Sequence, residues 1–321
     1  MSGTLGYQDK DDGVHLFDTP DYYEWWYFDG HFDNGYTCAL GFHKPFAHYK
    51  PHFPALNLSI YTPEGKDIAV VKPIDPNTCS LSAEKCDVKM GDYFARQEDK
   101  DTYHIYGKSK QGGADLIFRR KLPGWKPLGK GYLYDNGTEK QNWLVPCPRA
   151  EVEGTLWVGD KALKVKGLGY HDHNWGNCEM EDSLHRWFWG RLHHPDYTVI
   201  YYYLYPARKG EPDESRFYLA KGDKPILLPD HFNLKYSNEI RDDKYDQSIP
   251  SDLAISAKGD DAQFKMDIHC SAISTHAVID HAAPWKQYYW RLVADCKAEI
   301  TYGGKTDKIV GKPNSEYMLL R

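Results

Sequence analysis

The segment "GLGYHDHNWGN", residues 167–177, brings together side chains that can carry out acid–base chemistry. His171, Asp172 and His173 are consecutive, and Trp175 follows them. Imidazole and carboxyl groups can transfer protons near neutral pH when their surroundings adjust their pKa. An indole can line a cavity and stabilise positive charge through its ring face. The segment therefore predicts either an acid–base site or a set of core histidines held by hydrogen bonds.

The two-residue period of a β-strand predicts which of these side chains share a face. If residues 161–175 form one strand, Leu163 and Val165 face the interior, because the lysines beside them seldom bury fully. The same period predicts two sets: His171, His173 and Trp175 facing the interior, and Asp172 and Asn174 facing away from it. A bulge at Gly167 or Gly169 would reverse this assignment.

A second segment, "DYYEWWYFDG" at residues 21–30, places a carboxyl group among aromatic rings. Strand alternation puts Glu24 and Trp26 on one face and Trp25 on the other. A buried glutamate among indoles has a raised pKa and becomes a useful acid near neutrality. Alternatively, Glu24 pairs with an arginine such as Arg119 or Arg191.

A third segment, residues 185–206, is rich in aromatic residues: "HRWFWGRLHHPDYTVIYYYLYP". Trp187 and Trp189 share one face of a predicted strand, and Tyr201 and Tyr203 share one face of the next. Such aromatic walls suit a hydrophobic, unsaturated ligand, although a well-packed β-core has the same composition.

Metal, nucleotide and hydrolase sites have little support. His171 and His173 could present two metal ligands, but the next carboxylate, Glu179, follows only after five intervening residues. Divalent ions usually need at least three protein ligands. Glycine-rich phosphate loops and Gly-x-Ser-x-Gly elbows are absent from the sequence. We therefore predict no metal at this site.

Short alternating segments bounded by Asn-Gly, Gly-Gly and Pro-Gly turns occur in both halves of the chain. They predict an all-β protein of antiparallel meanders, with only short helices, for example near 279–289. A polar, acidic stretch at 177–185 separates the two halves. We therefore expect two β-domains, residues 1–180 and 181–321, each a barrel or a sandwich.

Charge and cysteine content narrow the class of protein. A net charge of −6 argues against nucleic-acid binding, and no apolar run is long enough for a transmembrane helix. Seven scattered cysteines without a signal peptide indicate reduced thiols and a cytoplasmic location. The sequence allows either a monomer or a homo-oligomer.

Two motifs, "EWWYFDG" (24–30) and "GTLWVGDKALKVKGLGYHDHNWG" (154–176), resemble the carotenoid 1,2-hydratase and AttH-like superfamily. That superfamily includes kievitone-type hydratases and lipocalin-like Diels–Alderases. The resemblance implies two packed lipocalin-like barrels, a hydrophobic ligand and no redox cofactor. For hydratases it implies functional roles for His173 and Trp175, and a proton-donating Asp in a Tyr-x-Asp element. Here that strand carries Tyr201-x-Tyr203, so Asp172, Glu24 or Asp29 would have to supply the proton, or the reaction is not hydration.

Three functions remain open. The first is an enzyme that protonates a C=C bond of an isoprenoid-like or polyene substrate, leading to hydration or cyclisation. The second is a cofactor-free pericyclase of secondary metabolism, and the third a carrier of a hydrophobic ligand. The candidate catalytic residues are His173, Asp172, His171 and Glu24. The candidate substrate-binding residues are Trp175, Trp26, Trp25, Tyr201, Tyr203, Trp187 and Trp189.

Overall fold

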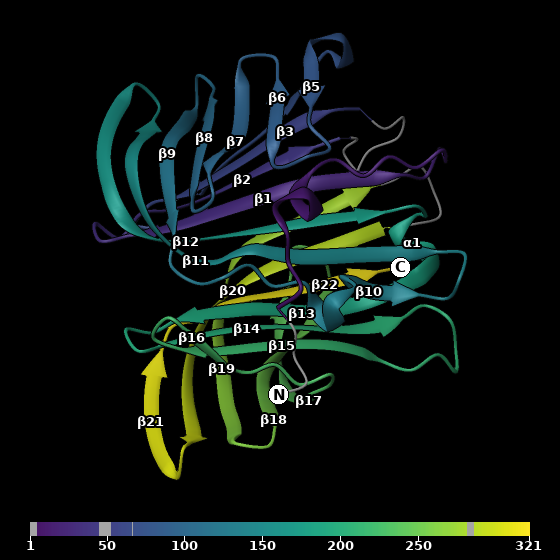
Figure 1. Ribbon diagram of the computed structural model, residues 1–321, viewed down its shortest axis with the longest axis vertical. Helices are drawn as coiled ribbons and strands as arrows, with labels where there is room; N and C mark the ends of the chain where they lie inside the picture. The colour runs from purple at the N-terminus through teal and green to yellow at the C-terminus, as the bar shows by residue number, and fades with distance from the viewer. Residues whose placement is uncertain (1–4, 45–52, 66, 281–285) are drawn as a thin grey trace. The chain divides into compact units, whose positions relative to one another are not determined.

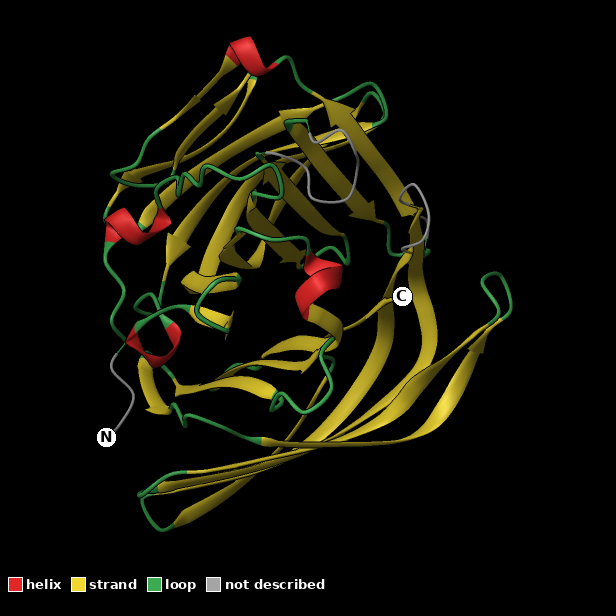
Figure 2. Cartoon of the chain, turned by 90° about the vertical axis from the view of Figure 1, so that its right-hand side faces the viewer, coloured by secondary structure: helices red, strands yellow, loops and turns green. Residues whose placement is uncertain are grey.

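The computed structural model describes residues 5–44, 53–65, 67–280 and 286–321. Figure 2 shows that strands make up most of the described chain, with short helical turns between them. The chain divides between Glu179 and Met180 into two compact units, next to the expected boundary at 180. We call them the N-terminal unit and the C-terminal unit. The predicted all-β class with antiparallel sheets and few short helices is confirmed.

The N-terminal unit is built on one antiparallel sheet with the strand order β4-β3-β2-β1-β12-β11-β9-β8-β7-β6-β5, and β10 pairs with β11 (Figure 1). Its strands are β1 Tyr23–Phe32, β2 Thr37–His43, β3 Ala55–Tyr61, β4 Asp67–Pro73, β5 Cys79–Leu81, β6 Asp87–Met90, β7 Tyr93–Asp99, β8 Thr102–Lys108, β9 Gly112–Arg120, β10 Tyr132–Asp135, β11 Lys140–Val158 and β12 Lys161–Gly176. Its short 3₁₀ turns are η1 Asp9–Asp12, η2 Pro76–Thr78 and η3 Pro127–Gly129.

The pairing of β12 with β1 decides the orientation of the histidine segment. The register runs without interruption from Gly176 opposite Tyr23 to Gly167 opposite Phe32. The bulges in this region lie on the other neighbour, β11, where the register with β12 shifts on both sides of Cys147. The two-residue period of β12 is therefore preserved, and His171 and His173 face the interior as predicted.

The interior of the N-terminal unit is a packed apolar core. It includes Trp26, Phe28, Leu40, Phe118 and Val152, all nearly inaccessible to solvent. A Cβ atom at Gly169 would lie 2.4 Å from Val152 and 2.5 Å from Phe118, so only glycine allows β12 to approach these side chains.

The C-terminal unit is built on a second antiparallel sheet with the order β16-β15-β14-β13-β22-β20-β19-β18-β17, and β21 pairs with β20. Its elements are α1 Met180–Ser183, β13 Leu184–His193, β14 Tyr197–Pro206, β15 Glu214–Lys221, β16 Lys224–Leu227, β17 Asn233–Asp242, β18 Gln247–Lys258, β19 Ala262–Asp280, β20 Lys286–Tyr302, β21 Lys305–Gly311 and β22 Asn314–Leu320.

The helix expected near 279–289 is wrong for the residues that can be checked. β19 continues to Asp280, which pairs with Lys286 at the start of β20, while residues 281–285 lie outside the described residues. Aromatic and β-branched residues such as Ile279, Tyr288 and Tyr289 favour strands, and here each has a partner on the opposite strand.

The aromatic residues of β13 and β14 do not form one wall. Phe188 lies opposite Tyr203, whereas Trp189 lies opposite Tyr202. Directly opposed residues in an antiparallel pair share a face, so Trp187 and Trp189 lie on the face opposite to Tyr201 and Tyr203. Each predicted pair shares a face, but the sequence does not give the register between the two strands and so could not show that the two pairs lie on opposite faces.

Two sequence expectations bear on the environment of the protein. The seven cysteines are all free. Within the described part of the chain, no helix combines the length and the apolar character needed to cross a membrane.

Candidate functional site

His171 and His173 lie on the interior face of β12, and a segment that precedes β1 supplies their main partner. Asp12, which is fully buried, places Oδ2 3.0 Å from Nε2 of His171 and Oδ1 3.2 Å from Nδ1 of His173. Nδ1 of His171 hydrogen-bonds to the carbonyl oxygen of Tyr27 at 2.9 Å. The histidines therefore tie the N-terminal segment to the sheet.

Glu24 on β1 extends this network toward the surface. Its Oε1 lies 2.9 Å from Nε2 of His173 and 3.0 Å from Nδ1 of His15, and it accepts a hydrogen bond from the backbone amide of His15 at 2.9 Å. Tyr22 donates its hydroxyl to the other carboxylate oxygen. The expected pairing of Glu24 with Arg119 or Arg191 is wrong, since the partners of its carboxylate are His15, His173 and Tyr22.

The prediction of a raised pKa at Glu24 is also wrong. Burial raises the pKa of Glu24, but hydrogen bonds and charge from His15 and His173 outweigh it and leave that pKa lowered. Burial lowers the pKa of His173, but its two carboxylate partners more than compensate and raise it to about 9. At neutral pH His173 is therefore an imidazolium held between the carboxylates of Asp12 and Glu24.

The interior network is closed by stacked rings. His171 stacks on Phe28 with centroids 3.9 Å apart, and His173 stacks on Trp26 at 4.4 Å. Trp26 also donates its indole N–H to the carbonyl oxygen of Asp12. His15 stacks on Trp175 at 3.8 Å and is the most accessible of these groups, with a side chain 28% exposed. The interior cluster is therefore tightly packed, and it reaches solvent mainly at His15.

Two sets of side chains in the network could bind a metal ion: His15, Glu24 and His173, and Asp12, Cys86 and His171. The ligand atoms of each set lie within 4.8 Å of one another. In the first set, both histidine nitrogens already hydrogen-bond to Glu24, so a cation would have to displace those bonds. The expectations of no metal and no redox cofactor remain predictions.

Asp172 lies on the opposite face of β12, in a second polar cluster. Its Oδ2 accepts hydrogen bonds from the indole of Trp143 at 3.0 Å and the hydroxyl of Tyr170 at 2.9 Å. Its Oδ1 accepts from the side-chain amide of Asn174 at 2.9 Å. Asp172 is only 5% exposed, and burial raises its pKa to about 7, although the bonds from Trp143 and Tyr170 oppose the shift.

The face around Asp172 carries half-buried aromatic side chains from β1. Tyr27 lies directly opposite Asp172, and Trp25 lies opposite Asn174. Asp29, a further candidate acid, is buried on the same face and accepts a hydrogen bond from the hydroxyl of Tyr27 at 3.1 Å. The negative charge of Asp29 also contributes to the raised pKa of Asp172. A carboxylic acid, its hydrogen-bond donors and two aromatic rings thus share one face.

The remaining predicted substrate-binding residues belong to the C-terminal unit. Tyr201 is fully buried in that unit's apolar core, and Tyr203 packs against the same core. The hydroxyl of Tyr201 lies against Gly190, where a Cβ atom would approach it to 2.4 Å. Trp189 is buried and Trp187 half-buried on the other face of β13. Their proposed contact with substrate remains a prediction.

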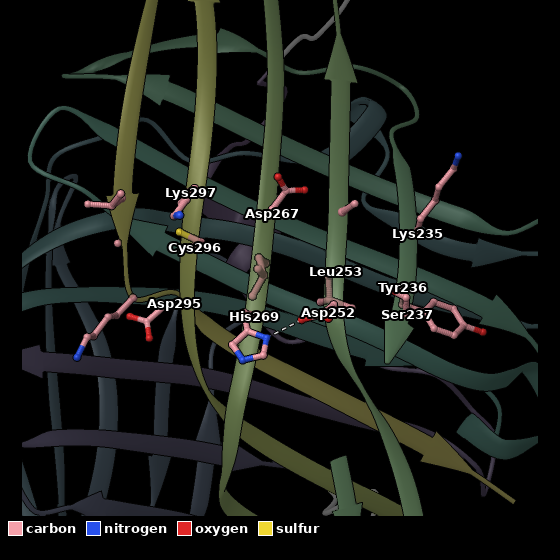
Figure 3. Close-up of a pocket in the computed structure, with 15 residues that line it drawn as sticks. Lys235, Tyr236, Ser237, Asp252, Leu253, Asp267, His269, Asp295, Cys296 and Lys297 are labelled. Atoms are coloured by element: carbon pink, nitrogen blue, oxygen red, sulfur yellow. Dashed lines mark hydrogen bonds and ion pairs between the residues drawn. The ribbon is translucent and has the colours of Figure 1, made fainter. Parts of the chain in front are cut away.

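The C-terminal unit also has a groove of about 970 Å³ over β17 to β21 (Figure 3). Charges alternate between adjacent strands: Asp267 lies opposite Lys297, and His269 lies between Asp252 and Asp295. His269 hydrogen-bonds to Asp252 at 2.6 Å. This pattern of mutually compensating charges is typical of a solvated sheet face, and we assign no function to it.

Sequence reasoning missed Asp12, His15 and Tyr22. Asp12 ends the short turn η1, and His15 and Tyr22 lie outside regular elements before β1, so neither strand nor helix periodicity indicates where these side chains point. Val14 donates its backbone N–H to the carbonyl of Ser82, and the ion pair of Asp11 with Lys126 holds the same segment. An acidic run followed by a histidine, "DKDDGVH", was the only available signal.

Comparison with known proteins identifies the family. The model of the AttH-like family matches residues 72–295, which is more than half of the chain. The chain belongs to the AttH-like family. The expected membership of the AttH-like superfamily is thereby confirmed.

Curated relatives of this AttH-like protein match over part of their length. Hydroxyneurosporene dehydrogenase of Chlorobaculum tepidum is 24% identical over 225 residues, covering 60% of this chain and 59% of the relative. A quinolone epoxide rearrangement protein of Emericella nidulans is 36% identical over 55 residues, covering 17% of this chain and 15% of the relative. The chain thus spans less than two thirds of the length of either protein.

Solved structures share the fold over nearly the whole chain. A protein from Nitrosomonas europaea assigned as AttH has a TM-score of 0.68 at 16% identity, covering 97% of this chain and 95% of that one. CghA with Sch210972 has a TM-score of 0.67 at 11% identity, covering 98% of this chain and 95% of that one. Kievitone hydratase of Nectria haematococca has a TM-score of 0.61 at 15% identity, covering 99% of this chain and 92% of that one. At these identities the similarity establishes the fold.

Proposed function

We propose that this protein is an enzyme that protonates a C=C bond of a hydrophobic, isoprenoid-like or polyene substrate, with Asp172 as the acid and no redox cofactor. The observation that carries the proposal is the buried Asp172 carboxyl with a pKa of about 7, on a face shared with Trp25 and Tyr27. A general acid works best when its pKa lies near the operating pH.

The surrounding side chains suit both stages of such a reaction. Proton transfer to the alkene leaves a tertiary carbocation, which the ring faces of Trp25 and Tyr27 can stabilise. The carboxylate left on Asp172 is then held by hydrogen bonds from Trp143, Tyr170 and Asn174. Capture of the cation by water gives hydration, and capture by a second group of the substrate gives cyclisation.

The interior histidines have a positioning role in this proposal. His173 and Glu24 belong to a closed network on the far face of the same strand, so they cannot contact a substrate that reaches Asp172. By binding Asp12 and Glu24, the histidines hold β12 against β1 and fix the relative positions of Asp172 and Tyr27.

The names of similar proteins are consistent with this chemistry. One structural neighbour is a hydratase, and one curated relative is named for hydroxyneurosporene. The seven free cysteines support a reducing, cytoplasmic location for the reaction.

The test uses a prenylated phenol, an acyclic isoprenoid alcohol and a linear polyene, incubated in D₂O and in H₂¹⁸O. We expect solvent deuterium at the carbon that receives the proton, and ¹⁸O in a hydrated product. Asp172→Asn should reduce turnover by about 10²–10⁴-fold. Asp115→Asn, at a partly exposed aspartate of the same unit that pairs with His104, is the matched control.

Two results would contradict the proposal and favour the alternatives. A cyclised product without solvent deuterium, formed equally well by Asp172→Asn, would indicate a pericyclase. Tight binding of these probes without any turnover would indicate a carrier.

A further inference from the structure

His43 lies on the same face of the sheet as Asp172, one strand beyond β1. Tyr27 is opposite Asp172 on β12 and opposite Gly41 on β2, while Trp25 is opposite His43. Because directly opposed residues share a face, His43 and Asp172 flank the two aromatic side chains of β1. His43 is 5% exposed, as is Asp172.

Gly41 determines where the imidazole of His43 points. A Cβ atom built on Gly41 would lie 2.5 Å from Nε2 of His43 and 3.2 Å from its Cδ2. The ring therefore leans back along β2 over Gly41, toward the row that contains Tyr27 and Asp172. It also lies beside Trp25, with centroids 5.8 Å apart. Any side chain at position 41 would push the imidazole out of this place.

We propose that His43 is the base that accepts a proton from the water molecule that captures the cation, an inference that rests on the proposed function. Neighbouring strands lie about 4.8 Å apart, so β2 and β12, which flank β1, are about 9–10 Å apart. Asp172 lies in the row of Tyr27 and Gly41, and His43 lies two residues further along β2, so the lean of its ring over Gly41 brings the imidazole toward the row of Asp172. Paired acid and base groups of inverting glycosidases stand about 6.5–9.5 Å apart to leave room for substrate and water. The spacing of β2 and β12 is close to the upper end of that range, and a substrate lying over Trp25 and Tyr27 would have Asp172 on one side and His43 on the other.

The proposed step balances in protons and electrons. The carboxyl of Asp172 gives its proton to one alkene carbon, and the π electrons form the new C–H bond. Water donates a lone pair to the cationic carbon, and its proton passes to Nε2 of His43. Solvent then returns the proton from His43 to Asp172, so the net change is addition of one water molecule.

The experiment separates protonation from water capture with a prenylated phenol in D₂O. In His43→Gln and in Gly41→Ala we expect hydration to fall by about 10²–10⁴-fold. In these variants Asp172 still delivers a deuteron, and the cation then loses a proton and returns to alkene. The ratio of deuterated substrate recovered to hydrated product should therefore rise. His104→Gln, at a partly exposed histidine of the same unit, should behave as the wild type. Free imidazole should restore hydration in His43→Ala. If His43 had only a structural role, added imidazole would not restore activity.

The outcomes distinguish this inference from the proposed function. Suppose that Asp172→Asn loses both deuterium exchange and hydration, while folded His43→Gln and Gly41→Ala hydrate as well as the wild type. This result would overturn the role of His43 and leave the proposed function intact. Full exchange and hydration in Asp172→Asn would overturn the proposed function itself. A parallel loss of exchange and hydration in His43→Ala, with no response to imidazole, would also refute the role of His43.

Discussion

Replacing Asp172 by asparagine tests its protonation without any substrate. The carboxyl has a pKa of about 7 in the folded protein, against an ordinary value of 3.8. A raised carboxyl pKa means that the folded state binds the proton more tightly than the unfolded state. The stability contributed by this proton is therefore present at low pH and is lost as the pH rises from about 4 through about 7.

The size of the effect follows from the shift. Each pKa unit corresponds to about 1.4 kcal/mol, so two pH units below the folded pKa, at pH 5, the proton contributes about 2.7 kcal/mol. At pH 8 the contribution is close to zero. Asparagine has nearly the same shape, and its carbonyl oxygen can accept from Trp143 and Tyr170, while Asn174 can turn its amide to accept from the new NH₂ group.

The assay is urea unfolding of wild type and Asp172→Asn at pH 5, 6, 7 and 8. We expect the free energy of unfolding of the variant, relative to wild type, to increase by about 2.5 kcal/mol between pH 5 and pH 8. Titrations common to both proteins cancel in the difference. A flat difference, or one that decreases with pH, would refute the protonated carboxyl and with it the proposed acid.

Three further predictions concern the network and the packing of β12. Glu24→Gln removes the carboxylate that binds His15 and His173, and should lower the unfolding free energy by about 3–5 kcal/mol in denaturant titrations; an unchanged midpoint would contradict the network. The raised pKa of His173 stabilises the fold fully below pH 6.5, and this contribution is lost as the pH rises through about 9. Thermal unfolding should show that loss in wild type and not in His173→Gln. Gly169→Ala introduces a methyl group 2.4 Å from Val152 and should lower the free energy of unfolding by about 1–3 kcal/mol. In the control Gly137→Ala the new methyl group meets no neighbour, so packing stays intact, although the positive φ at this position adds strain.

The fold and the facing of β12 were predictable because they depend on local patterns. Turn residues and alternation defined strands in both halves, and Leu163 and Val165 set the phase that His171 and His173 continue. A bulge at Gly167 or Gly169 would have reversed the predicted faces. The bulges lie instead on the neighbouring strand β11, and β12 keeps an uninterrupted register with β1. The register between β13 and β14 had no comparable signal, so the faces of Trp187 and Tyr201 could not be matched.

The residues that complete each cluster come from elsewhere in the chain, and the sequence does not indicate their approach. Asp12 at the end of η1 and His15 just after it both precede β1, and His43 is oriented by the absence of a side chain at Gly41. These contacts depend on tertiary packing, which no periodicity encodes. A short pattern can thus mark a strand as chemically unusual without showing which of its two faces is reactive.

Glu24 and Asp172 show why burial alone could not assign the acid. Both carboxyls are nearly inaccessible, and burial raises the pKa of each. Glu24 faces His173, a cation, and its pKa is lowered. Asp172 receives hydrogen bonds from uncharged donors and lies near the carboxylate of Asp29, so its pKa stays raised. The charge of the partners on each face of β12 therefore decides which carboxyl can deliver a proton at neutral pH. The segment before β1 packs on the interior face, where its Asp12 helps to keep His173 protonated beside Glu24.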